Sequence, residues 1–184
     1  SSTPGDQVLF DDSATGVTSV NIASDVSPAQ VTVNNAAKSY TFTGAKITGP
    51  GALVKQGTGS LTISNSGNDY TGGTVIQAGT VVLGGVNVLP TAGNLTLTGG
   101  TLNLNAASQD VSGAFILDGG TVHFGQINKT GAAYELRSGT VTGLKFGYAG
   151  GATQHQISGL EVVADVGALN GTIGIGADAP FALA

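Results

Sequence analysis

Residues 51–85 read GALVKQGTGSLTISNSGNDYTGGTVIQAGTVVLGG, and this stretch decides the fold. Two short segments in it, 61–64 and 81–83, are apolar or alternate apolar with polar side chains, and each follows a Gly-Ser or Gly-Thr pair. A polar bend lies between them. Alternation with a period of two is typical of strands that bury one face, and glycine permits the tight corners between such strands. The stretch therefore predicts short strands joined by glycine corners.

The glycine corners recur at a nearly constant interval through the middle of the chain. Gly-Ser or Gly-Thr pairs begin at residues 59, 79, 100, 120 and 139, and large apolar positions keep the same register. A meander would also alternate, but it has no reason to hold a period of about 20 residues, whereas the stacked turns of a solenoid do. The sequence predicts an all-β parallel β-helix (β-solenoid). Its expected core residues are Leu95, Leu97, Leu102, Leu104, Phe115, Leu117, Val122, Phe124, Tyr134, Leu136 and Val141.

The central stretch also resembles the autotransporter-associated β-strand repeat, or passenger-associated transport repeat, of large secreted bacterial proteins. That family shows a glycine-flanked LTxxGxGxLTLS followed by NxYTGGTxVxxGTLxLG; this chain has ALVKQGTGSLTIS and NDYTGGTVIQAGTVVLG. The segment FDDSA at 10–14 is similar to the FDxSA with which many such proteins begin. The resemblance implies a right-handed parallel β-helix exported to the bacterial surface or secreted. It implies no reaction.

We expect one continuous solenoid domain with three parts. Residues 1–50 would form irregular N-terminal rungs, 51–143 the regular repeat rungs, and 144–184 irregular C-terminal rungs with an apolar tail. The pair Gly159-Leu160 lies 20 residues after Gly139-Thr140, which favours continuation of the period.

Composition excludes several classes of function. Only 9% of the 184 residues are charged, against roughly 25% in ordinary domains, and the 11 acids and 6 bases form no run. No nucleic-acid partner is therefore expected. The absence of cysteine excludes disulfides, and no apolar run reaches the ~18 residues of a transmembrane helix. Sparse charge gives weak repulsion between copies, which favours self-association.

The polar motifs give few candidates for chemistry. Asn68 and Asp69 are turn formers and Tyr70 an expected cover for the core, with ligand contact as the alternative. Asp11 and Asp12 could act as paired carboxylates or bind calcium, but no repeated GGxGxD turn accompanies them, so a loop role is expected.

Six further residues are considered as parts of an enzyme or metal site. Asp118 should lie near Arg137 and Ser138 one rung on, with no second acid joining them, and Glu135 and Arg137 should form a solvated pair. His123 should face outward, and it is 32 residues from His155, which is not a whole number of rungs. No GxSxG elbow occurs. We expect no catalytic, cofactor-binding or metal site.

Two hypotheses for function remain, with a β-helix polysaccharide-active enzyme as a weaker third. The first is a structural, self-associating subunit of a fibre, sheath or matrix, whose partners are other copies of the chain. The candidate contact is the uncharged tail Pro180, Phe181, Ala182, Leu183 and Ala184. The second is an adhesin-like passenger segment that binds glycans or surfaces. Four Tyr, six Phe and no Trp offer no obvious sugar platform, which favours the first.

Overall fold

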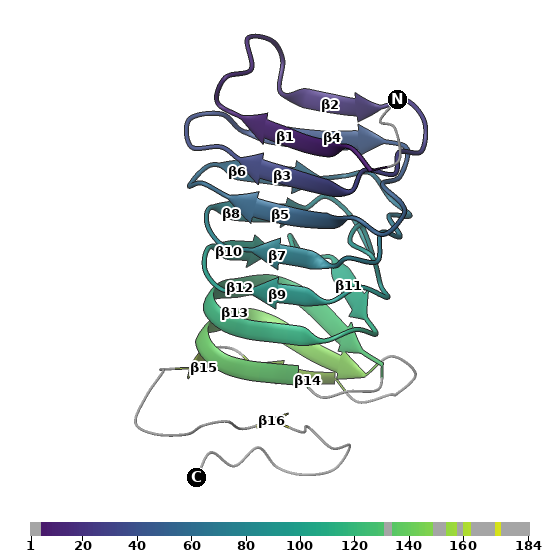
Figure 1. The fold of residues 1–184 in the computed structure, drawn as a ribbon. Helices are drawn as coiled ribbons and strands as arrows, with labels where there is room; N and C mark the ends of the chain where they lie inside the picture. The colour runs from purple at the N-terminus through teal and green to yellow at the C-terminus, as the bar shows by residue number, and fades with distance from the viewer. Residues whose placement is uncertain (1–4, 131–133, 149–153, 158–159, 163–171, 174–184) are drawn as a thin grey trace.

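The computed structural model describes residues 5–130, 134–148, 154–157, 160–162 and 172–173. They form about seven stacked turns of roughly 21 residues in one continuous solenoid (Figure 1). None of the described residues is helical, so none contributes a helix that could cross a membrane. The prediction of an all-β parallel β-solenoid is confirmed.

Two walls of the solenoid are continuous columns of parallel strands. The first wall holds β1 (Gln7–Asp11), β3 (Gln30–Asn34), β5 (Ala52–Gln56), β7 (Thr74–Ile76) and β9 (Leu95–Leu97), and then the first parts of the long strands β12 (Phe115–Lys129) and β13 (Tyr134–Tyr148). The second wall holds β2 (Ser19–Ile22), β4 (Tyr40–Gly44), β6 (Ser60–Ile63), β8 (Thr80–Leu83) and β10 (Thr101–Asn103), and then the middle of β12 and β13.

A third wall is strand-like only toward the C-terminal end. There β11 (Ser108–Val111) pairs with the last part of β12, which pairs with the last part of β13. Toward the N-terminal end, the pairing within this wall is an isolated parallel bridge between Val26 and Ile47. Between these two regions, the rungs are joined by backbone hydrogen bonds outside regular strands, such as Asp69 N–H to Ile47 O at 3.1 Å, and by side-chain amides, as described below.

The turns shorten along the first wall. Gln7 pairs with Gln30, a step of 23 residues; Leu53 pairs with Thr74, a step of 21; and Phe115 pairs with Tyr134, a step of 19. Residues 5–50 thus follow the same columns as the regular rungs, with longer steps.

The core is a stack of inward side chains from the three walls. The residues expected in the core are at most 7% exposed, with one exception. Phe124 is 55% exposed, so its expected core position is wrong. Its φ of 57° is left-handed, which turns the chain at a corner after the second wall. Alternation counted from Val122 does not carry across such a corner, because the residue there points away from both strands.

The C-terminal end reverses direction. The strands β14 (Gln154–Ile157), β15 (Leu160–Val162) and β16 (Thr172–Ile173) each pair antiparallel with β13. Leu160 lies opposite Val141 in this antiparallel ladder, so the expected continuation of the parallel period through Gly159-Leu160 is wrong. These strands form hydrogen bonds with backbone N–H and C=O groups of β13, which would otherwise be available to pair with a further parallel rung.

Candidate functional site

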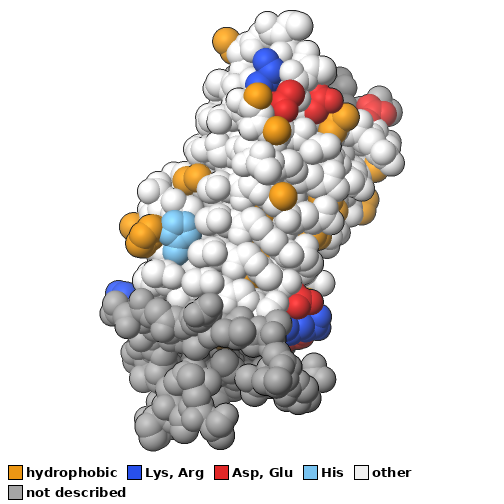
Figure 2. All heavy atoms as spheres, turned by 90° about the vertical axis from the view of Figure 1, so that its left-hand side faces the viewer, with side chains coloured by type: hydrophobic (Ala, Val, Ile, Leu, Met, Phe, Trp, Pro, Cys, Tyr) orange, Lys and Arg blue, Asp and Glu red, His pale blue; other side chains and the backbone are white. Residues whose placement is uncertain are grey.

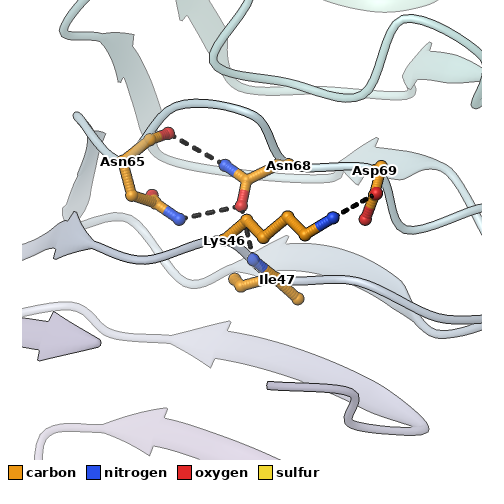
Figure 3. A network of polar contacts seen from close by, with 5 residues as sticks. All are labelled: Lys46, Ile47, Asn65, Asn68 and Asp69. Atoms are coloured by element: carbon orange, nitrogen blue, oxygen red, sulfur yellow. Dashed lines mark hydrogen bonds and ion pairs between the residues drawn. The ribbon is translucent and has the colours of Figure 1, made fainter. Parts of the chain in front are cut away.

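The bend before Tyr70 is a buried amide network (Figure 3). The Oδ1 atom of Asn68 accepts from the backbone N–H of Ile47 at 2.7 Å, and its Nδ2 donates to the carbonyl oxygens of Asn65 at 3.0 Å and Val88 at 2.7 Å. Asn68 is only 6% exposed. Its amide thus bonds to the main chain of the rungs on either side, as a strand would do through its backbone.

Gln109 repeats this arrangement further along the third wall. It is fully buried, accepts from the N–H of Leu89 at 3.1 Å and donates to the carbonyl of Leu89 at 3.0 Å. Side-chain amides therefore tie the third wall where regular strand pairing is missing. The reading of Asn68 as a turn former missed this role, because composition does not show which amide points inward.

The neighbouring Asp69 and Tyr70 serve the fold. Asp69 Oδ2 lies 2.7 Å from Lys46 Nζ at the surface, and this contact lowers the pKa of Asp69 and raises the pKa of Lys46. The Tyr70 ring is 2% exposed, with its hydroxyl 2.7 Å from Thr74 Oγ1. Burial raises the pKa of Tyr70 well above its usual range. Tyr70 covers the core, as expected.

The carboxylates Asp11 and Asp12 hold loops. Asp12 accepts from the backbone N–H groups of Ala36 at 2.9 Å and Lys38 at 2.9 Å, one rung on, and these bonds lower its pKa. Asp11 accepts from the N–H and hydroxyl of Ser13, which lowers its pKa likewise. Both carboxylates are engaged by their own chain.

Asp118, Arg137 and Glu135 form one exposed cluster. Arg137 lies 3.5 Å from Asp118 and 2.8 Å from Glu135, and Ser138 donates to Asp118 at 3.4 Å. The expectation that no second acid joins Asp118 is wrong in this respect, because Glu135 reaches the same guanidinium. All three side chains are at least 41% exposed, so the cluster is a solvated ion pair network on an open surface.

The two histidines lie on different strands. His123 is in β12, half-buried and outward, and His155 is in β14, opposite Phe146. Within the described residues, no group of three or more His, Asp or Glu side chains is placed to hold a metal ion. The tail 180–184 lies outside the described residues.

Two buried lysines were missed by the sequence reading. Lys55 lies in the inward column of the first wall, between Val33 and Ile76, and is fully buried. Its Nζ donates to the corner carbonyls of Gln56 at 2.5 Å and Gly57 at 2.9 Å. Burial lowers the pKa of Lys55 to about 8. The signal was present in the sequence, since residue 55 follows Leu53 by two.

Lys129 is the second buried lysine. It is 1% exposed and donates to the carbonyl of Gly113. Burial lowers its pKa, partly offset by Glu135. Both ammonium groups thus satisfy corner carbonyls from inside the solenoid, where an apolar side chain would leave those oxygens without a donor.

The N-terminal end of the solenoid is hollow. A cavity of about 520 Å³ opens there, lined mainly by apolar side chains of β1, β2 and the segment that follows β2, among them Val8, Phe10, Val20, Ile22 and Val26. The strands β1 and β2 end the path of paired strands, so each has an outer edge without a strand partner in the described chain. This apolar mouth is a candidate surface for association.

The corner at Phe124 is the other candidate surface. The Phe124 ring is 55% exposed, its centroid lies 4.3 Å from that of His123, and a Cβ built on Gly143 would be 3.4 Å from the ring. A left-handed φ costs a bulky residue about 1–2 kcal/mol. Burial lowers the pKa of His123, so its imidazole is uncharged near neutral pH. The corner presents a fixed, neutral aromatic surface.

The comparisons with known proteins each cover part of the chain. Residues 53–83 match the family described as passenger-associated-transport-repeat. A segment of 54 residues is 48% identical to the adhesin BmaC autotransporter of Brucella suis biovar 1, which covers 29% of this chain and 2% of that protein. No solved structure matches. The matched residues 53–83 run from β5 to β8 and so include strands of both the first and the second wall. This chain therefore carries a passenger-associated transport repeat, folded as rungs of a parallel β-solenoid.

Proposed function

We propose that this chain is a non-catalytic segment of a cell-surface or secreted bacterial adhesin passenger. The carrying observation is that a passenger-associated transport repeat lies inside uninterrupted columns of strands, in a chain that shares a 54-residue segment with an autotransporter adhesin. Such stacked rungs form a stiff arm that can hold a binding surface away from the cell. The largely uncharged face in Figure 2 fits a role in contact and display.

Adhesion is tested by displaying the chain on the surface of a non-adherent bacterium. We expect attachment to epithelial cells or to a matrix-coated surface to rise, and the purified chain to compete for it. The control is a segment of the same length from an unrelated β-solenoid, displayed in the same way, which shows how much attachment comes from displaying any solenoid of this size. Attachment no better than this control would contradict the proposal.

A second candidate, self-association, is favoured by the apolar mouth at the N-terminal end. The opposite end differs, because β13 is paired antiparallel with β14, β15 and β16 of the same chain. A contact made by one end of each copy is isologous and closes as a dimer. A fibre would need another contact besides this one. We therefore place a mouth-to-mouth dimer ahead of a filament.

The dimer is tested by sedimentation velocity at increasing concentration. Val8→Asp puts a charge in the mouth, and Val17→Asp is a matched control because Val17 is 90% exposed outside it. We expect a dimer for the natural chain and for Val17→Asp, and a folded monomer for Val8→Asp. A natural chain that stays monomeric at high concentration would remove this candidate.

A further inference from the structure

We propose that Phe124 and His123 form a stacking platform for a pyranose ring of a neutral glycan. The proposal rests on the proposed adhesive function and locates one binding surface for it. Phe124 adopts a backbone conformation that is unfavourable for its residue type, and the stability of the fold does not explain its presence there. Phe124 has a left-handed φ of 57°, and the residue at the same corner one rung on is Gly143, with a φ of 60°. The register confirms this equivalence, since His123 pairs with Thr142 and Gly125 with Leu144.

Glycine meets the backbone demand of this corner without strain, and phenylalanine does not. The ring gains little burial in return, because it is 55% exposed. Strained residues that the fold does not require are found at binding surfaces. The exposed Phe124 ring is therefore best explained by contact with a ligand.

The ring is also held in place. A Cβ built on Gly143 would lie 3.4 Å from the ring, and His123 packs beside the ring at an interplanar angle of 57°. The backbone carbonyl of Phe124 accepts from Ala106 N–H at 2.6 Å, which ties the corner to the previous rung. A ring fixed before binding loses little conformational freedom when a ligand stacks on it.

The surrounding chemistry selects the class of ligand. The outward partners of His123 in the register are Asn103 and Thr142, an amide and a hydroxyl. A pyranose has an apolar face of C–H groups that suits the negative face of an aromatic ring, and a rim of hydroxyls that suits amides and hydroxyls. The neutral imidazole offers no charge to an anionic sugar. A protein partner would need an apolar surround that excludes water from the anchor, whereas these neighbours are polar.

The experiment measures binding of the purified chain to an array of neutral oligosaccharides of hexoses and N-acetylhexosamines. We expect the natural chain and Phe124→Tyr, which keeps the ring, to bind the same glycan. Phe124→Asn and Phe124→Gly should bind at least tenfold more weakly. Val86→Ala, which truncates another exposed apolar side chain, should bind as the natural chain does.

A second measurement separates binding from folding. We expect the urea midpoint of Phe124→Asn to equal or exceed that of the natural chain, because asparagine tolerates the left-handed conformation. Three results would each overturn the proposal: a loss of stability in Phe124→Asn, glycan binding by Phe124→Asn that stays within twofold of that of the natural chain, or an array to which the natural chain does not bind. Cells that attach through the displayed chain despite a blank array would leave the adhesive function standing and remove only this platform.

Discussion

The side chain of Asn68 donates a hydrogen bond to the carbonyl oxygen of Val88, 2.7 Å away in the next rung. On its other side the same amide accepts from Ile47 N–H, in the previous rung. One side chain thus links three successive rungs along the wall that has the fewest strands. A buried amide that meets two backbone groups adds to the few backbone hydrogen bonds that join these rungs, among them Asp69 N–H to Ile47 O at 3.1 Å.

Replacing Asn68 with alanine should cost about 2–4 kcal/mol, because the buried N–H of Ile47 and carbonyl of Val88 would each lose a partner. Urea denaturation monitored by circular dichroism measures this loss. The adjacent Asp69→Asn is the control, since it removes only a surface ion pair with Lys46 and should cost less than about 1 kcal/mol. Equal costs for the two variants would show that the amide carries no such role.

Lys55 should make stability depend on pH in the alkaline range. Its pKa is about 8 in the folded chain and 10.5 as an ordinary lysine, so between these values the unfolded state binds more protons. The free energy of unfolding should therefore rise with pH through this window, by up to about 3 kcal/mol, and be insensitive to this group below pH 8.

The comparison with Lys55→Met isolates this group. Methionine is close in length and does not titrate, so the difference in unfolding free energy between the natural chain and Lys55→Met should grow in favour of the natural chain from pH 8 to pH 10.5. Lys38→Met, at a half-buried loop position, serves as the control. A difference that stays constant over this range would mean that Lys55 is charged and well solvated in the folded chain.

The stacking of rungs could be predicted from sequence because it is periodic. Leu95, Phe115 and Tyr134 lie in one column of the structure, as their spacing indicates. These equivalent positions in successive rungs are all apolar, so a wrong assignment at one rung is corrected by the assignments at the others. The period also places the parallel register, which a single alternating segment could not do.

The sequence predictions fail at single residues that depart from the repeating pattern. Phe124 lies at a corner, and the alternation that predicts inward and outward positions does not continue across a corner. Asn68 and Lys55 are polar residues at inward positions, and only the structure shows to which carbonyl oxygens they donate hydrogen bonds. The sequence did not predict the reversal at β14, because the residue pattern of an apolar strand is the same in parallel and antiparallel pairing.

Leu102 and Val122 pair directly across adjacent rungs, and both are fully buried. Leu102→Asp would bury a carboxylate without a partner and should cost at least about 3 kcal/mol, or prevent folding. Thr96→Asp, at an outward position of the first wall, should cost less than about 1 kcal/mol. Chemical denaturation of both compares them, and similar losses would indicate a wrong register.

We expect no turnover of pectin, alginate, xylan or peptidoglycan by the purified chain. Among the described acids, Asp12 holds a loop, Asp110 accepts from the amides of Asn87 and Asn128, and Asp118 lies on open surface at 45% exposure. The bonds that Asp12 accepts lower its pKa, away from the value that a general acid needs. Assays for reducing ends and unsaturated products test this, with Asp118→Ala as the comparison. Robust turnover that Asp118→Ala abolishes would establish an enzyme instead.

Gly79 should be far less tolerant of substitution than Gly67, although both have left-handed φ values, of 69° and 74°. A Cβ on Gly79 would lie 2.2 Å from the carbonyl oxygen of Gly59 and 2.7 Å from Lys55 Nζ, whereas nothing lies within 4 Å of one on Gly67. Rungs about 4.8 Å apart leave no space for a methyl group between stacked corners. The recurring glycines thus reflect the stacking of rungs as well as the turn itself.

Gly67→Ala should therefore cost only the strain of its backbone, about 1–2 kcal/mol. Gly79→Ala adds displacement of the preceding corner and of the Lys55 ammonium, and should cost about 2 kcal/mol more or fail to fold. Thermal and urea unfolding of the two variants measure the difference directly. Were the two losses the same, backbone conformation alone would account for these glycines, and the close stacking of corners would not be what limits the period of the rungs.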